Sequence, residues 1–179
     1  VALLELDVRF NSIQGTLSSE LEDLKELTSL SCSNNMLTGR IPSFSTNRML
    51  NTLRLENNKL TGTLTPFASN ADMLALDLSG NLLTGTIPPN FLASCHPSTK
   101  VTIDLSRNML TGTVPGELAR LTQATIYLRD NALSAIAPEL CQNIDWNEGD
   151  VGAYQCNGIM CAPGFFSPGT GRTSKSGAI

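Results

Sequence analysis

The chain has 179 residues, enough for one domain or for one domain with a small appendage. Its net charge at pH 7 is only −4, which argues against nucleic acid or an anionic membrane surface as the main partner. No apolar run approaches the ~20 residues that cross a bilayer, so we expect no membrane span in this segment. The opening residues Val1–Leu6 lack the basic start of a secretory signal, and we expect the true N-terminus to lie upstream.

An asparagine recurs six times in the same sequence context, at intervals of 24, 23, 23, 27 and 23 residues. An aliphatic residue stands five positions before each asparagine and another stands two positions after it. The position three before the asparagine is aliphatic in five repeats and Cys32 in the second. The resulting pattern, LxxLxLxxNxL with a period of roughly 20–29 residues, is that of a leucine-rich repeat. The six asparagines are Asn11, Asn35, Asn58, Asn81, Asn108 and Asn131.

Each repeat predicts a short strand whose alternate residues point inward, because side chains along a strand have a period of two. One such coil cannot bury its apolar face alone, whereas stacked coils share a continuous core. The asparagine lies where the chain turns in from the strand, and its amide can satisfy backbone groups of its own and the adjacent coil. We therefore predict that the six asparagines form a buried structural ladder. Six strands about 4.8 Å apart make a sheet about 24 Å long, which is a short arc.

A second motif follows the ladder asparagine. Leu37–Pro42, Leu83–Pro88 and Leu110–Pro115 share the pattern LTGxIP or LTGxVP, and Leu60–Thr65 keeps it apart from the proline. The glycine permits a turn that a side chain would obstruct, and the proline fixes φ where the chain leaves a short second strand. The motif resembles the plant-type (LxGxIP) extracellular leucine-rich-repeat family, found in ectodomains of receptor-like kinases and in secreted polygalacturonase inhibitors. The resemblance covers roughly residues 1–140.

This resemblance implies an α/β-type solenoid: a short right-handed arc of about six repeats, with a parallel sheet on the concave side and 3₁₀ turns and short strands on the convex side. It also implies a secreted protein at an extracellular or cell-surface location, with a protein, peptide or glycan partner. We expect residues 1–140 to form this solenoid domain. The interval between Asn81 and Asn108 is longer than the others, so residues 91–100 are expected to form a bulging convex loop.

The repeat ceases near Cys141, and residues 141–179 are predicted to form a cysteine-containing cap and tail. Cys141 stands ten residues after its ladder asparagine, in the register of an inward convex position, so the chain must fold back to cover this end of the core. We expect Cys141 to form a disulfide with Cys156 or Cys161, with Cys95 as a further candidate.

The string from Cys156 to Arg172 resembles the cysteine-rich segment that follows leucine-rich repeats in surface proteins of diatoms and related algae. That resemblance implies a further cysteine-rich region beyond Ile179. The remaining cysteine, Cys32, holds an inward strand position, which predicts a buried free thiol.

No catalytic arrangement stands out, because the single histidine, His96, lies in the expected loop. The spacing of Cys156 and Cys161 does not match a zinc site, so we predict no metal. Asp77 and Asp104 share one strand register, and aligned carboxylates fit a cation site or acid–base chemistry. A solvated strand face is the favoured interpretation. We predict that the protein is not an enzyme and uses no cofactor.

Strand residues that point away from the core form the concave face. Its middle is small and polar, whereas aromatic and arginine residues gather at its two ends, and binding hot spots favour Tyr, Trp and Arg. The candidate contact residues are Arg9, Phe10, Arg54, Glu56, Arg107, Tyr127 and Arg129.

Three functions remain open. The leading hypothesis is an extracellular recognition or adhesion module that binds a protein, a peptide or a glycan. The second is a structural subunit of an extracellular filament or cell coat, in which the solenoid packs against copies of itself. The third, an inhibitor of a secreted wall-degrading enzyme, follows only from the family resemblance.

Overall fold

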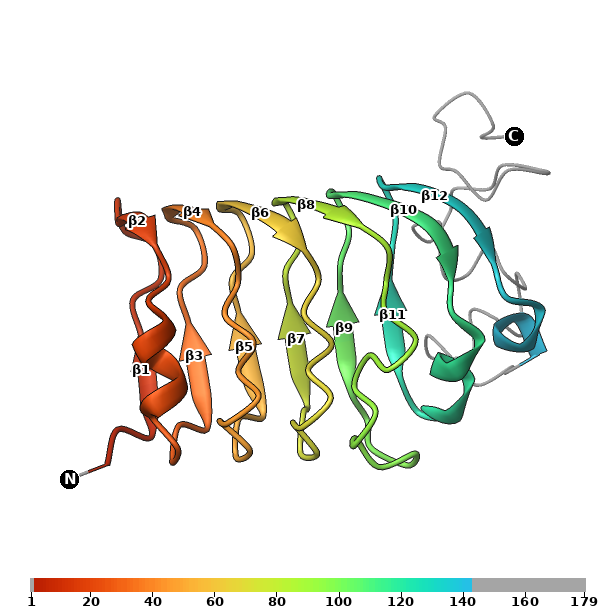
Figure 1. The fold of residues 1–179 in the computed structure, drawn as a ribbon, viewed down its shortest axis with the longest axis horizontal. Helices are drawn as coiled ribbons and strands as arrows, with labels where there is room; N and C mark the ends of the chain where they lie inside the picture. The colour runs from red at the N-terminus through yellow and green to blue at the C-terminus, as the bar shows by residue number, and fades with distance from the viewer. Residues whose placement is uncertain (1, 143–179) are drawn as a thin grey trace.

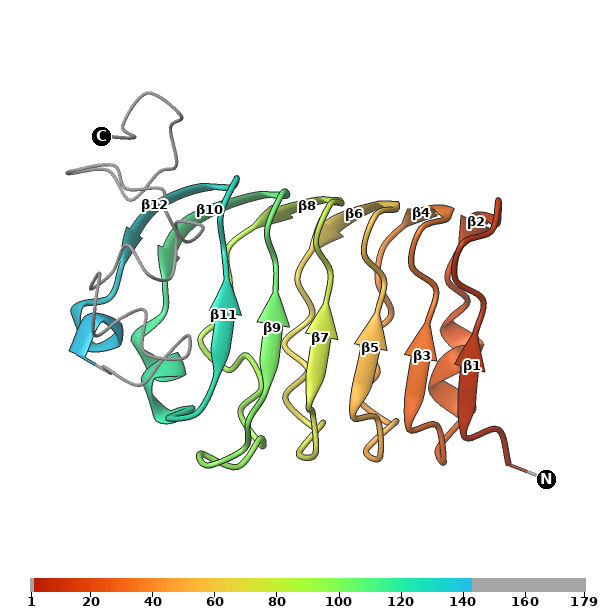
Figure 2. The same ribbon diagram turned by 180° about the vertical axis from the view of Figure 1, so that it is seen from behind.

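The computed structural model describes residues 2–142, which wind into six stacked coils, each carrying one ladder asparagine. The first strand of every coil joins one parallel sheet, the first sheet, in the order β1-β3-β5-β7-β9-β11 (Figure 2). Each of these strands aligns with the equivalent residues of the next coil without any offset. The strands are Glu5–Asp7 (β1), Ser29–Ser31 (β3), Thr52–Arg54 (β5), Ala75–Asp77 (β7), Thr102–Asp104 (β9) and Thr125–Tyr127 (β11).

The second strand of every coil joins another parallel sheet, the second sheet, which runs along the upper edge of the solenoid (Figure 1). These strands form where the LTG motif lies. They are Gln14–Thr16 (β2), Met36–Gly39 (β4), Lys59–Thr63 (β6), Leu82–Gly85 (β8), Met109–Val114 (β10) and Ala132–Ile136 (β12).

Short 3₁₀ helices close three of the coils on the convex side: Ser19–Asp23 (η1), Gly116–Arg120 (η2) and Pro138–Gln142 (η3). The predicted fold, a parallel-strand arc of about six turns with 3₁₀ turns and few helical residues, is therefore confirmed.

Inward leucines and isoleucines at equivalent positions fill the space between the two sheets. Along the middle of the first sheet, Leu30, Leu53, Leu76, Ile103 and Ile126 are each 0–1% exposed. Each fully buried side chain of this size contributes about 1.5–3 kcal/mol, so stacking provides the main stabilisation. On the convex side Phe67 and Phe91 meet edge to face with ring centroids 6.0 Å apart, which links coils three and four.

Five of the six asparagines bind the coils to one another. In the fourth coil, the Asn81 amide nitrogen donates to the Leu78 carbonyl of its own coil at 3.1 Å and to the Leu55 carbonyl of the preceding coil at 3.0 Å. Its amide oxygen accepts from the Leu60 backbone N–H at 3.0 Å. Equivalent bonds occur at Asn35, Asn58, Asn108 and Asn131. Asn11 is exposed, and its amide donates only within its own coil.

A second ladder, which the sequence analysis missed, runs along the convex side. Asn47 and Asn70 are fully buried and donate to carbonyls of the preceding coil. They stand twelve residues after Asn35 and Asn58. In the fifth coil the same position is Arg120, whose guanidinium donates to the carbonyls of Leu92 and Cys95. Residues 91–100 form turns here, and the longer side chain reaches across the extra residues.

The last coil departs from the predicted register. The β10–β12 ladder shifts by one residue, so that Gly112 faces Leu133 but Thr113 faces Ala135. The repeat spacing predicts an inward position for Cys141, and that prediction is wrong. Leu140 fills the interior, fully buried, while Cys141 is only half-buried, because the last coil reaches its convex turn one residue sooner: Leu140 stands nine residues after Asn131, whereas the buried Leu118 stands ten after Asn108.

One prediction about the cysteines, that for Cys95, is also wrong. Cys32 carries a free thiol that is 4% exposed, and burial raises its pKa to about 11. Cys95 is likewise free and buried, so it is wrong as a disulfide candidate. Its carbonyl accepts from the Arg120 guanidinium, and its thiol lies 3.8 Å from the Met73 carbonyl. The expected partners Cys156 and Cys161 lie outside the described residues, so the proposed pairing of Cys141 stays a prediction.

We predict that Asn81→Ala lowers the free energy of unfolding by at least about 2 kcal/mol, because each buried backbone group left without a partner costs about 1–3 kcal/mol. Asn11→Ala is the matched control, since Asn11 is exposed and makes no bond to another coil. We expect the control to lose well under half of that amount. Urea titrations followed by circular dichroism measure both values. Equal losses for the two variants would contradict the account of the inter-coil bonds.

Candidate functional site: two faces of the solenoid

Outward residues of the first sheet form the concave face, and the alignment of the strands arranges them in straight rows. The first row lies at the last residue of each strand, and the second row lies two residues further on. The first row is Asp7, Ser31, Arg54, Asp77, Asp104 and Tyr127, and the second row is Arg9, Ser33, Glu56, Ser79, Ser106 and Arg129.

At the N-terminal end the arginine is tied to a neighbouring carboxylate. The Arg9 guanidinium bonds to Asp7 with a shortest N–O distance of 2.6 Å. The side-chain and backbone hydrogen bonds from Arg9 lower the pKa of Asp7 to about 2. Beside this pair Phe10 is 75% exposed. This end therefore offers an apolar ring next to a neutralised ion pair.

The central carboxylates form hydrogen bonds with serines of the face. Asp77 accepts from the Ser79 hydroxyl at 2.7 Å, and Asp104 accepts from the Ser106 hydroxyl at 2.6 Å. Burial raises the pKa of Asp77, although the bonds from Ser79 oppose that shift. In residues 2–142 no three His, Cys, Asp or Glu side chains are grouped so as to hold a metal ion. The aligned carboxylates are thus parts of the polar strand face.

At the C-terminal end three candidate residues come together. The backbone N–H of Arg107 donates to the Arg129 carbonyl at 2.9 Å, which places the two arginines on adjacent coils. Tyr127 lies two residues before Arg129 and is 38% exposed. The Arg107 guanidinium also donates to the Asn57 side chain at 3.3 Å, passing over Gly80, which has no side chain to obstruct it. We call Arg107, Tyr127 and Arg129 the C-terminal cluster.

Arg54 and Glu56 belong to the third coil and join neither end. Glu56 accepts from the Ser33 hydroxyl at 2.5 Å, and Arg54 is exposed beside Asp77 in the strand alignment. The seven candidate residues therefore form three groups along the face. About 24 Å of sheet separates the first coil from the sixth.

The residue before each ladder asparagine has a left-handed backbone in all six coils. No sequence pattern predicted this feature. The φ angles lie between 54° and 62°. Asn, Asp and Gly adopt this conformation most readily, whereas other residues cost about 1–2 kcal/mol. Phe10 and Arg107 hold this position at that cost, and both are candidate contact residues. The six are Phe10, Asn34, Asn57, Gly80, Arg107 and Asp130.

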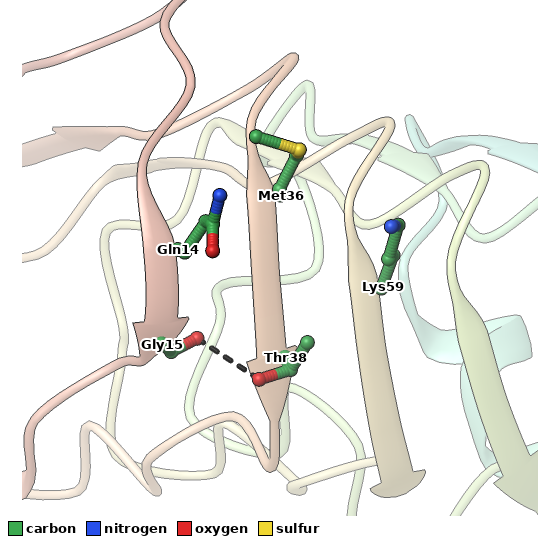
Figure 3. A pocket seen from close by; sticks show the side chains of 5 residues that line it. All are labelled: Gln14, Gly15, Met36, Thr38 and Lys59. Atoms are coloured by element: carbon green, nitrogen blue, oxygen red, sulfur yellow. Dashed lines mark hydrogen bonds between the residues drawn. The ribbon is translucent and has the colours of Figure 1, made fainter.

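The second sheet presents a different surface, which we call the threonine face. Its outward positions carry no carboxylate, and Lys59 and Arg40 are its only charged side chains. At its N-terminal part a shallow hollow of about 320 Å³ is lined by Gln14, Gly15, Met36, Thr38 and Lys59 (Figure 3). Exposed threonines occur on this face in every coil but the last. The face consists of Gln14, Thr16, Met36, Thr38, Arg40, Lys59, Thr61, Thr63, Leu82, Thr84, Thr86, Met109, Thr111, Thr113, Ala132 and Ser134.

Comparison with known proteins agrees with the geometry. The family model described as Leucine Rich Repeat matches residues 26–47, 74–93 and 101–121. These coils are leucine-rich repeats. The matches fall on coils two, four and five, and the remaining coils place their strands in the same two sheets. No curated protein sequence matches the chain.

Solved leucine-rich-repeat structures resemble this chain. The ectodomain of the receptor kinase GASSHO1/SCHENGEN3 from Arabidopsis thaliana, in complex with CASPARIAN STRIP INTEGRITY FACTOR 2, aligns over 81% of this chain and 17% of its own, with 28% identity and a TM-score of 0.73. A plant ice-binding protein aligns over 74% of this chain and 42% of its own, with 34% identity and a TM-score of 0.65. The plant peptide hormone receptor RGFR1, in complex with RGF2, aligns over 74% and 21%, with 33% identity and a TM-score of 0.63. The chain thus spans less than half the length of each.

Outside the two faces of this leucine-rich-repeat solenoid, the convex loop holds His96. Its imidazole Nδ1 accepts from the Ser98 backbone N–H at 3.2 Å, and the side chain is exposed. Among residues 2–142 no helix has the length and apolarity needed to cross a membrane.

Arg107→Asn should raise the free energy of unfolding by up to about 1 kcal/mol, because asparagine tolerates the left-handed backbone at this position. Arg107→Ala removes the same guanidinium without that advantage, and we expect no gain from it. Thermal and urea melts of the two variants measure the difference. A variant with asparagine that is no more stable than the variant with alanine would show that the backbone at this position carries no strain.

Proposed function

We propose that the protein is a non-enzymatic extracellular recognition module that binds a peptide or protein segment on its concave face. The observation that carries this proposal is the C-terminal cluster, where a tyrosine and two arginines are exposed on adjacent coils. The Arg129 guanidinium suits a carboxylate, and the tyrosine beside it adds apolar area with a polar tip. Two of the similar solved structures hold partners named in their complexes, and this supports a ligand on a repeat of this kind.

The unfavourable backbone conformation of Arg107 also supports ligand binding on the concave face. A left-handed arginine where asparagine or glycine would fit better is a destabilising choice, and such choices gather at functional sites. In the centre of the face, Asp77 and Asp104 are already hydrogen-bonded to serines of the same face. An extended ligand would therefore be anchored at the ends and would lie across these small serines.

Panning a phage-displayed random peptide library against the purified protein tests this proposal. We expect enriched peptides whose affinity falls by at least about tenfold, or 1.4 kcal/mol, in Arg129→Ala and in Tyr127→Ala. Arg48→Ala, which removes an exposed arginine outside both faces, is the matched control and should bind as the parent does. Peptides that bind all four proteins equally would overturn the concave-face proposal.

Two alternatives are distinguished by sedimentation at micromolar concentration. A recognition module, or an inhibitor of a wall-degrading enzyme, is expected to sediment as a monomer. A subunit of a filament or cell coat is expected to sediment as larger species that grow with concentration. A glycan partner would bind a glycan array while the peptide library gave no enrichment.

A second candidate function is adsorption to ice. The observation that favours it is the threonine face, which is exposed, almost uncharged and repeated from coil to coil. The similarity to a plant ice-binding protein at 34% identity supports this candidate. We expect the purified protein to inhibit ice recrystallisation and to be taken up by a growing ice hemisphere, with bovine serum albumin as the inert control. Exclusion of the protein from the ice would reject this function.

A further inference from the structure

Six threonines of the second sheet form one continuous staircase, because this sheet is staggered where the first is not. Each strand is offset by two residues from the one before, so Thr63 of the third coil stands opposite Thr84 of the fourth. The next pair continues the same register, in which Gly85 faces Leu110 and Thr86 is therefore followed by Thr111. Successive threonines are therefore neighbours in two ways that alternate: two residues apart on one strand, and opposite each other on adjacent strands. We call Thr61, Thr63, Thr84, Thr86, Thr111 and Thr113 the threonine staircase.

Contacts between neighbouring coils position the side chains at both kinds of step. The first threonine of a coil donates its hydroxyl to the glycine carbonyl of the preceding coil: Thr84 to Gly62 at 3.4 Å and Thr111 to Gly85 at 3.3 Å. The second threonine packs its methyl group over the glycine of the next coil. A Cβ atom at Gly85 would lie 2.9 Å from the Thr63 methyl, closer than real contacts allow.

These contacts order an exposed surface before any ligand arrives. Because the Thr84 and Thr111 hydroxyls donate their protons to glycine carbonyls, their oxygens can accept hydrogen bonds from a ligand, and the methyl groups of Thr63 and Thr86 lie against the glycine of the next coil. The steps measure about 4.8 Å between strands and about 6.6 Å along a strand. A repeating grid of identical side chains on two fixed spacings suits a ligand that is itself periodic.

The chemistry of the grid selects among periodic ligands. A mineral surface would call for carboxylates or other charged groups, and the staircase has none. A crystalline polysaccharide would call for aromatic platforms, and these too are missing from the threonine face. Alternating hydroxyls and methyl groups suit a lattice of water molecules, whose oxygens both donate and accept at spacings of this size.

The staircase has defined ends. Thr16 and Thr38 lie opposite each other in the same register, so the staircase would extend to the first coil if Arg40 did not interrupt it. The Arg40 side chain packs over Gly62, where threonine packs in the other coils. At the other end, the register shift between Gly112 and Thr113 places Ala135 opposite Thr113 and ends the pattern.

We propose that the threonine staircase is the ice-adsorbing site and that Arg40 limits its length. This inference rests on the second candidate function and adds the site to it. Arg40→Thr joins Thr16 and Thr38 to the six threonines, and a longer grid attaches through more simultaneous contacts.

The experiment compares Thr84→Tyr, Arg40→Thr and the parent protein in ice recrystallisation inhibition and in uptake by a growing ice hemisphere. Thr102→Tyr is the matched control, because Thr102 is also an exposed strand threonine but lies on the concave face. We expect Thr84→Tyr to raise the lowest inhibiting concentration by about tenfold, since one bulky ring lifts the whole grid off the ice. We expect Arg40→Thr to lower that concentration and Thr102→Tyr to leave it unchanged.

Circular dichroism melts confirm that all four proteins are folded. A parent protein without activity would reject the ice function itself. An active parent whose activity survives Thr84→Tyr would overturn the staircase as the site, and an Arg40→Thr variant no better than the parent would overturn the role of Arg40. If Thr84→Tyr instead dissolves an oligomer seen by sedimentation, the face is a contact between copies of the chain and the proposal is wrong.

Discussion

Every coil has to satisfy the polar backbone where the chain leaves the first sheet, and the asparagine amide does this for two coils at once. Its oxygen accepts from the preceding coil while its nitrogen donates to carbonyls of both. Neighbouring coils are thereby held at equivalent positions, and the first sheet has no offset. The straight rows of the concave face follow from this constraint, because outward residues of successive strands must then stand side by side.

The second sheet obeys a different rule, and glycine is the reason. The sequence pattern explains Gly39, Gly62, Gly85 and Gly112 as turn residues, and their positive φ angles agree. The structure adds a contact: at each of them a Cβ atom would come within 2.7–2.9 Å of a side chain of the preceding coil. The glycine therefore also makes room for that neighbour, and the stagger of the strands brings the two together.

Much of the fold could be predicted because it depends on one residue type at a regular interval. The ladder positions and inward leucines repeat visibly, and the outward strand residues follow from them by alternation. The second ladder could not be read, since only Asn47 and Asn70 repeat and Arg120 replaces the third member. The left-handed position holds Phe, Asn, Gly, Arg and Asp, so its residue type gives no signal.

The register between strands of the second sheet could not be predicted either. A repeat pattern shows which residues are equivalent in successive coils, but it does not show which residues pair across neighbouring strands. That is why the threonine staircase emerged only from the paired strands. Cys141 was misplaced for another reason: counting ten residues from Asn131 assumes coils of equal length, whereas in the last coil Leu140, nine residues after Asn131, takes the core position. On the concave face, register located the candidate residues but did not show that the central carboxylates are bonded to serines.

The hydrogen bonds from Arg120 to the carbonyls of Leu92 and Cys95 allow one coil to be longer than its neighbours without a change in the spacing between coils. The fourth coil has a longer perimeter than its neighbours, yet the strands before and after it pair as evenly as the others. A long, flexible donor absorbs the difference on the convex side, where a short amide would fall out of reach. Loops on that side can therefore vary in length through evolution while the surfaces built from the strands keep their spacing.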